Sequence, residues 1–352
     1  MPSPDHYFSP DYFTARDRFR TAATQAGGRL EILPLTAKGP KGEILSIDLS
    51  WFGATEPQRL LLHSSGIHGV EGFAGSAIQL QLIENLPALP SGSAIVVVHT
   101  LNPFGMTWLR RVNENNVDLN RNFRSNGSFA GAPSIYAALD HFLNPRTPPS
   151  SDFYFAKTAY LIARYGMTAL KQSVVGGQYD FPKGLFFGGK QLEEGPRKYE
   201  AFLKRRLSTA HKTIAIDIHT GLGKFATDSL LVESEDHAFL QARFGQRVRS
   251  LQPNQGPAYR VAGGLESMIF RVFAQRPMFV CQEFGTYGAA RVLHALREEN
   301  RWHQYGKGSV DHVSKRNLME VFCPADDRWR LAVLERGRVL VEQAVKELGR
   351  EQ

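Results

Sequence analysis

The sequence is poor in cysteine and has no long apolar run, and both absences limit what the protein can be. Its 352 residues include two cysteines, Cys281 and Cys323, which are too few for a disulfide framework or a zinc ribbon. No run of about 18 apolar residues occurs, and the polar N-terminal segment lacks the apolar centre of a signal peptide. We therefore expect a cytoplasmic protein that does not bind membranes, in which histidines and carboxylates hold any metal.

Other classes of function also lack support in the sequence. It contains neither the GxSxG pattern of many serine hydrolases nor the GxxxxGKS pattern of phosphate-binding loops, so neither a serine hydrolase nor a nucleotide-binding enzyme is indicated. The net charge of +8 comes from scattered basic residues, and the densest run, Lys204-Arg205-Arg206, falls in an expected helix that also carries Glu200. A solvated helix face explains that run better than a nucleic-acid site does.

The order of apolar segments predicts the fold class. Several short runs are apolar throughout and alternate with helical patterns, which is typical of a parallel or mixed sheet covered on both faces. The expected strands are 29–35, 42–52, 60–65, 94–99, 213–218, 228–233 and 278–283, and the expected helices are 10–26, 71–86 and 329–348. Turn residues between the first two strands predict a hairpin. With no repeat and no linker, residues 1–352 are expected to form a single α/β domain with a twisted, mixed, mostly parallel sheet.

Residues 125–212 are the least regular part of the chain. They contain a Pro/Ser-rich stretch, two or three expected helices and the Gly- and aromatic-rich segment 176–195. Long structured loops inside compact domains are often functional. We expect either an insertion whose loops cover the substrate or a segment that merely covers a sheet edge.

A histidine and a glutamate lie three residues apart where an expected strand meets an expected helix. In the sequence His68-Gly69-Val70-Glu71 the spacing is close to one helical turn, so both side chains can point the same way. A nitrogen donor beside an oxygen donor suits a borderline-soft cation such as zinc.

Two further residues of suitable chemistry end two other expected strands. His219 follows 213–218, and Glu283 ends the strand that begins at Met278. Ligand sites in open α/β sheets lie beyond the carboxyl ends of the strands. Two histidines and one carboxylate would leave zinc an open position for water, and Glu283 is the candidate general base for that water.

The polar segment 113–123, NENNVDLNRNF, supplies the remaining candidates. Asp118 could accept a hydrogen bond from the free ring nitrogen of a ligand histidine. Asn120 and Arg121 could bind a substrate carboxylate, for which the guanidinium fork is well shaped. Just before this segment, Arg110 or Arg111 could stabilise a developing oxyanion.

In this order the pieces resemble the zinc carboxypeptidase superfamily, the carboxypeptidase A-like metallopeptidases. The local sequences around these pieces resemble a little-characterised bacterial branch of that superfamily. The matching pieces are His68-Gly69-Val70-Glu71, Asp118-Leu119-Asn120-Arg121, His219 and Glu283. The resemblance implies a zinc-dependent exopeptidase (phosphorylase/hydrolase-like) fold, with one Zn²⁺ per chain.

The resemblance also implies roles for single residues. His68, Glu71 and His219 would be the zinc ligands, and Glu283 the general base. Asn120 and Arg121 would hold the terminal carboxylate of the substrate, and Asp118 would orient His68. For the oxyanion arginine we favour Arg111, with Arg110 as the reserve.

The resemblance does not extend to every part of the family pattern. The mobile tyrosine that carboxypeptidases place before the base has two candidates here, Tyr259 and Tyr287, and neither carries a motif. Cys281 shares a strand face with Glu283, but buried cysteines are commonly inert packing. His63 and His99 lie within expected strands and are interpreted as core or supporting histidines.

The site therefore predicts a zinc hydrolase that cleaves an amide bond next to a free carboxylate. An N-acyl-amino-acid deacylase resembling aspartoacylase and succinylglutamate desuccinylase is the alternative, and the partner in either case is a small peptide or an acylated amino acid. A metal-binding protein without catalysis is a remote third, since binding alone has no use for Glu283.

Overall fold

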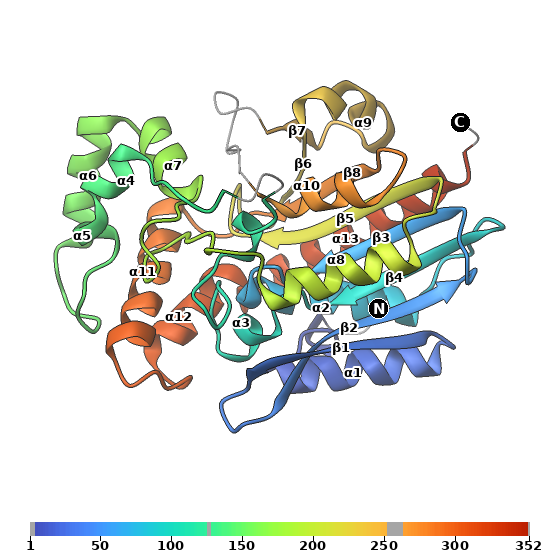
Figure 1. The fold of residues 1–352 in the computed structure, drawn as a ribbon, viewed down its shortest axis with the longest axis horizontal. Helices are drawn as coiled ribbons and strands as arrows, with labels where there is room; N and C mark the ends of the chain where they lie inside the picture. Colours follow the sequence, from blue (N-terminus) through green and yellow to red (C-terminus); the bar gives the residue numbers. More distant parts are fainter. Residues whose placement is uncertain (1–3, 125–127, 252–262, 351–352) are drawn as a thin grey trace.

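Eight strands form one mixed sheet, which the computed structural model describes together with its helices over residues 4–124, 128–251 and 263–350 (Figure 1). Across the sheet the strands are β1 (Arg29–Lys38), β2 (Ile44–Gly53), β4 (Ser93–His99), β3 (Arg59–Ser65), β5 (Lys212–Thr220), β8 (Met278–Phe284), β6 (Asp228–Val232) and β7 (Val248–Ser250). The central strands β4, β3, β5 and β8 are parallel, whereas β1, β2 and β6 pair antiparallel to their inner neighbours. The predicted mixed, mostly parallel sheet in one α/β domain is confirmed.

The central strands are buried on both faces, as their unbroken apolar sequences predicted. Every residue of β4 and β5 is buried, and so is every residue of β3 after Arg59. Strands of this kind depend on helices above and below the sheet.

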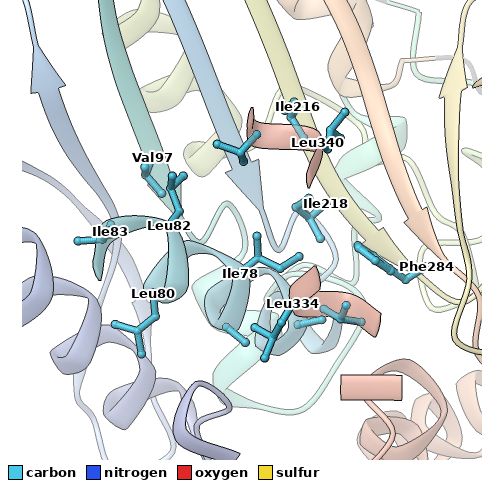
Figure 2. Packing of buried hydrophobic residues seen from close by; sticks show 14 of the residues in the cluster. Ile78, Leu80, Leu82, Ile83, Val97, Ile216, Ile218, Phe284, Leu334 and Leu340 are labelled. Atoms are coloured by element: carbon cyan, nitrogen blue, oxygen red, sulfur yellow. The ribbon is translucent and has the colours of Figure 1, made fainter. Parts of the chain in front are cut away.

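Three helices cover one face of the sheet: α1 (Tyr12–Gln25), α2 (Gly72–Glu84) and α13 (Asp327–Leu348). Figure 2 shows Ile78 of α2 and Leu334 of α13 packed together near Ile218 and Phe284 of the sheet. The two helices approach closely because Gly337 has no side chain, and a Cβ there would lie 2.7 Å from a methyl carbon of Ile78. The carboxyl ends of the strands are thereby anchored to a rigid layer.

The opposite face is covered by α8 (Glu194–Arg206) and α10 (Leu265–Val272). Tyr199 and Phe202 of α8 and Met268 of α10 belong to one buried cluster with Leu62 and Ala215 of the strands. Helices therefore lie on both faces, as predicted.

A further group of helices lies beyond the carboxyl ends of the parallel strands (Figure 1). Its members are α4 (Ser134–Ala138), α5 (Asp140–Leu143), α6 (Tyr154–Tyr165), α7 (Met167–Val175), α11 (Ala289–Tyr305) and α12 (Val313–Phe322). These helices share a separate apolar cluster that includes Leu139, Val174 and Leu318. Residues 125–212 thus hold more helix than predicted, while 176–195 is irregular up to the start of α8.

The remaining elements are short. They are the helices α3 (Pro103–Thr107) and α9 (His237–Phe244) and the 3₁₀ turns η1 (Pro4–His6), η2 (Gly69–Glu71), η3 (Leu119–Arg121) and η4 (Ser234–Asp236). Within the described ranges, no helix is both long enough and apolar enough to cross a bilayer.

His63 and His99 are core residues, as the sequence suggested. Both are fully buried, and burial lowers the pKa of each to about 4. The His99 ring stacks on Phe19 with 4.9 Å between ring centroids, and its Nε2 lies 3.1 Å from the Ser76 hydroxyl. The folded protein therefore holds His99 as the neutral imidazole.

Replacing His99 by glutamine should flatten the dependence of stability on pH. Because the folded pKa lies below the ordinary value of 6.5, the unfolded chain takes up the proton first as pH falls. The stability due to neutral His99 is complete above pH 6.5 and is lost as pH falls towards 4, by up to about 3 kcal/mol. Urea unfolding between pH 4 and 7 should show a smaller decline for His99→Gln than for the unaltered chain. The exposed control His211→Gln should keep the full decline; an equal decline in all three proteins would contradict the assignment.

Candidate metal centre and active site

The corner between β3 and α2 is shaped by glycines and by a neighbouring segment. Gly66 has φ of +66°, and a Cβ on Gly69 would lie 2.0 Å from the backbone of Gly105 in α3. The backbone N–H of Gly69 donates to the carbonyl of Arg111 at 3.1 Å, and that of Val70 to the carbonyl of Arg110 at 3.0 Å. The corner and the arginine segment are therefore held together by main-chain contacts that do not depend on side-chain identity.

The structure brings the three predicted metal ligands together. Glu71 lies between the histidines: its Oε1 is 2.9 Å from Nδ1 of His68, and its Oε2 is 3.1 Å from Nδ1 of His219. One donor atom from each of the three side chains lies within 4.8 Å of the other two, and all three residues are buried. His68 and Glu71 come from the corner after β3, and His219 comes from the adjacent parallel strand β5.

These three residues fit a zinc ion. Two imidazole nitrogens and one carboxylate are a common donor set for zinc with an open fourth position. Nδ1 of His68 is buried and makes no hydrogen bond of acceptable geometry, despite its short distance to Glu71. A buried ring nitrogen needs a partner, and coordination to a metal would provide one.

Each of the two histidines also has a carboxylate beside its Nε2. Nε2 of His68 lies 2.9 Å from Asp118, and Nε2 of His219 lies 2.8 Å from Asp217. Such carboxylates fix the tautomer and leave Nδ1 for the metal. Asp118 was predicted from the sequence and Asp217 was not, although a strand places residues two apart on one face and Asp217 precedes His219 by two.

Arg111 is the arginine that contacts His68 and Glu71, which together with His219 are called the metal group below. Its guanidinium donates to Glu71 at 3.0 Å and to Asp118 at 3.0 Å. Its Nη2 is also 2.7 Å from Nε2 of His68, a nitrogen that cannot donate to Asp118 and accept from Arg111 at once. The charged Asp118 is the stronger partner for that nitrogen, so we assign the Nε2 proton to the Asp118 hydrogen bond and treat the Arg111 approach as a contact only.

Neighbouring charges keep the two carboxylates of this group ionised. Burial alone would raise the pKa of Asp118, but Arg111, Arg121 and His68 hold it well below the usual value. In the same way, His68 and His219 overcome burial and keep the pKa of Glu71 low.

Glu283 occupies the place expected for a general base. It pairs in register with His219 on the adjacent strand, and a carboxylate oxygen lies within 4.8 Å of a His219 ring nitrogen. The backbone N–H of Leu222 donates to this carboxylate at 2.8 Å, and burial raises the pKa of Glu283 to about 7. Cys281, on the same strand, has a pKa raised well above the usual value by burial, which disfavours the nucleophilic thiolate.

These residues line a cavity of about 210 Å³. His68, Glu71, His219, Glu283, Arg111 and Asn120 form part of its wall, and helices α5, α6, α7, α11 and α12 supply most of the rest. Lys171 of α7 and Glu266 of α10 also reach the cavity. Neither Lys171 nor Glu266 was predicted, because nothing in the local sequence marks either one.

Arg110 and Arg121 lie behind the cavity wall. The fully buried Arg110 donates to Glu299 at 2.9 Å, which gives it a structural contact on α11 and leaves Arg111 as the only one of the pair that lines the cavity. Arg121 donates to the carbonyl of Val175, the last residue of α7, and to the carbonyl of Asn120. Neither Arg110 nor Arg121 lines the cavity in this structure, and their roles towards a substrate stay predictions.

Of the other residues predicted for the site, Asn120 lies in the cavity wall and Tyr287 does not. The Asn120 side-chain oxygen accepts a hydrogen bond from the backbone N–H of Leu265 at 2.9 Å, which fixes Asn120 beside the start of α10. The Tyr287 hydroxyl contacts Glu320. Tyr259 lies outside the described residues.

Comparison with known families places the chain in one of them. Residues 8–336 match the family described as a protein of unknown function, DUF2817, and the chain belongs to that family. No curated protein matches the chain.

Solved structures that are similar to this chain include the following three. A carboxypeptidase A from Helicoverpa armigera is 13% identical, with 90% of this chain and 74% of that chain covered and a TM-score of 0.47. A murein-tripeptide amidase from Escherichia coli O157 is 18% identical (78% and 92% covered, TM-score 0.37). An aspartoacylase family protein from Mesorhizobium loti is 15% identical (79% and 67% covered, TM-score 0.38). The TM-scores of these three are below 0.5, and the site is described here from its geometry alone.

Substituting Asp217 by asparagine should weaken metal binding without unfolding the protein. The amide cannot take the carboxylate's place as a charged acceptor for Nε2 of His219, so zinc affinity should fall about 10- to 100-fold. Competition with a chromophoric chelator measures this affinity directly. Asp118→Asn should behave alike and the exposed control Asp180→Asn should not; equal affinity in Asp217→Asn and the unaltered chain would refute the supporting role.

Proposed function

We propose that this protein is a zinc-dependent hydrolase that cleaves an amide bond next to a free carboxylate. The observation that carries the proposal is the position of the Glu283 carboxylate beside His219, in the same cavity wall as His68 and Glu71. A protein that only binds a metal has no use for a buried base at that position.

His68, Glu71 and His219 would hold the zinc ion, which when bound supplies Lewis acidity and lowers the pKa of its water. Glu283 would accept the proton of that water on its carboxylate and return it to the leaving amine. Arg111, held between Glu71 and Asp118, would donate hydrogen bonds to the developing oxyanion.

We assign the substrate carboxylate to Asn120 and Lys171. Arg121 is turned towards the carbonyl of Val175 at the end of α7, so it would act by positioning Asn120 and this helix end. Lys171 precedes Val175 by four residues and therefore lies on the same side of α7. Both residues line the cavity, as Asn120 does. Lys171 thus offers a cation in the wall of the cavity that Asn120 also lines.

We further propose that residues 125–212 act as the insertion that covers the substrate. Helices α6 and α7 form one wall of the cavity, and Phe186 of the segment 176–195 forms another part of it. The cavity volume of about 210 Å³ favours a small substrate, so an N-acyl amino acid is a second candidate beside a short peptide.

Glu283→Gln should abolish turnover while zinc remains bound. Glutamine is nearly isosteric but cannot accept the proton, so kcat should fall about 10²- to 10⁴-fold. Hydrolysis of a panel of dipeptides and N-acyl amino acids, together with zinc content by atomic emission, measures both parts. The exposed control Glu235→Gln should match the unaltered chain. Full activity of Glu283→Gln, or zinc-loaded protein that hydrolyses nothing in the panel, would overturn the proposal.

Lys171→Met should raise KM for substrates with a free carboxylate by about 10-fold or more, with a smaller change in kcat. A charge-assisted hydrogen bond contributes about 1.5–3 kcal/mol, and the same substitution should not affect substrates whose carboxylate is blocked as an amide. Steady-state kinetics on matched free and blocked substrates gives the comparison. Lys157→Met, on the exposed side of α6, is the control; equal KM changes for free and blocked substrates would exclude the assigned contact.

A further inference from the structure

The lining of the cavity comes from two groups of elements with different chemistry. Near the start of α10 it includes Asn120 and Glu266. The insertion helices, the segment 176–195 and α11 supply the part that we call the apolar chamber; its walls include Leu143, Thr158, Leu161, Leu170, Phe186 and Leu293. The metal group and Glu283 also line the cavity.

Helix α7 contributes both chemistries to the cavity. Val174 belongs to the apolar cluster of this helix group, and Leu170 and Val175 pack against it. Leu170, Val174 and Val175 line the cavity together with Lys171, and Lys171 is the only one of these four with a charged side chain.

The walls of the chamber offer a ligand few polar partners. The hydroxyl of Thr158 donates to the carbonyl of Tyr154 within α6, and the other residues that define the chamber have hydrocarbon side chains. Burying a polar or charged group against such walls without a hydrogen bond is costly, whereas burying an apolar group is favourable.

The chamber adjoins the proposed oxyanion site. The Arg111 guanidinium lies over the Phe186 ring, 5.4 Å from its centroid, and the same ring lines the cavity. Phe186 is fixed in the left-handed region (φ 56°), and its carbonyl accepts a hydrogen bond from the backbone N–H of Gln178. A carbonyl group positioned at Arg111 would therefore have its substituent beside the apolar wall.

We propose that the apolar chamber binds the acyl half of the substrate, so that the protein hydrolyses amides between a bulky apolar acyl group and an amino acid with a free carboxylate. This inference rests on the proposed function, because it takes the carboxylate to lie at Asn120 and Lys171 and the scissile carbonyl at Arg111. The acyl group is of intermediate size, since the chamber shares a cavity of about 210 Å³ with the amino-acid half.

The dependence of kcat/KM on acyl length tests the proposal in the zinc-loaded protein. The substrates are N-acetyl, N-succinyl, N-butanoyl, N-hexanoyl and N-hexadecanoyl derivatives of leucine and of lysine. Each buried methylene contributes about fourfold, so kcat/KM should rise at least 10-fold from acetyl to hexanoyl and fall again at hexadecanoyl. The dipeptides Leu-Leu and Gly-Leu distinguish a peptidyl from an alkyl source of the same apolar group. Equal rates along the series, or a preference for acetyl or succinyl, would overturn the proposal.

Two chamber variants should move this preference in opposite directions. Thr158→Trp fills the chamber from α6 and should lower the hexanoyl-to-acetyl ratio of kcat/KM at least fivefold. Leu161→Ala enlarges the chamber and should shift the optimum to a longer chain. Ala163→Trp, on the exposed side of the same helix, is the control and should keep the original ratio. An unchanged ratio in a folded Thr158→Trp variant would contradict the assigned position.

Calorimetry on the metal-free protein separates this inference from the proposed function. N-hexanoyl-leucine should bind more tightly than N-acetyl-leucine, with a more negative heat-capacity change from burial of apolar surface, and Thr158→Trp should abolish the difference. If this chain-length effect occurs but the zinc-loaded protein hydrolyses nothing, the chamber binds the acyl group as proposed and the proposed function is wrong. If hydrolysis occurs without any chain-length effect, the proposed function is supported and the assignment of the acyl group to the chamber is wrong.

Discussion

The rest of the site depends on buried charges that must be balanced at one edge of the sheet. Glu71, Asp118 and Asp217 are three carboxylates without solvent access, and the arginines that approach them are Arg111 and Arg121. Removing a charge from water is costly unless other charges and hydrogen bonds compensate. His68 and His219 contact these carboxylates, and a bound dication would supply the remaining positive charge. Metal binding and the stability of this part of the fold therefore depend on the same balance of buried charges.

Several main-chain segments meet at this edge of the sheet and position the side chains of the site. Parallel strands β3, β5 and β8 end at one edge and deliver His68, His219 and Glu283 there. Main-chain hydrogen bonds from the corner to the arginine segment bring Arg111 to the same place. Helices α2 and α13 pack against one face of the sheet close to these strand ends (Figure 2). Catalytic precision here would come from rigid elements, whereas the insertion helices shape the volume that the substrate occupies.

The sequence predicts the sheet and the metal group because both depend on local patterns. Apolar runs identify the strands, and residues at strand ends identify the crevice, so His68, Glu71, His219 and Glu283 can be found without a structure. Asp217 could also have been found, because alternation places it on the face of His219. Lys171 could not be identified, and the contact of Arg121 with the end of α7 could not be predicted, since both depend on how α7 packs against segments far away in the sequence. The choice between Arg110 and Arg111 depends on which of two neighbouring side chains faces the cavity, and this requires the packing of Glu299.

We propose that His68, Glu71 and His219 hold one zinc ion through the two Nδ1 atoms and the carboxylate. X-ray absorption spectroscopy at the zinc edge of the loaded protein reports these ligands. We expect one zinc per chain with two imidazole nitrogens at about 2.0–2.1 Å, oxygen in the remaining positions and no sulfur ligand. One imidazole should be lost in His219→Ala. A sulfur ligand at about 2.3 Å, or a spectrum unchanged by His219→Ala, would contradict it.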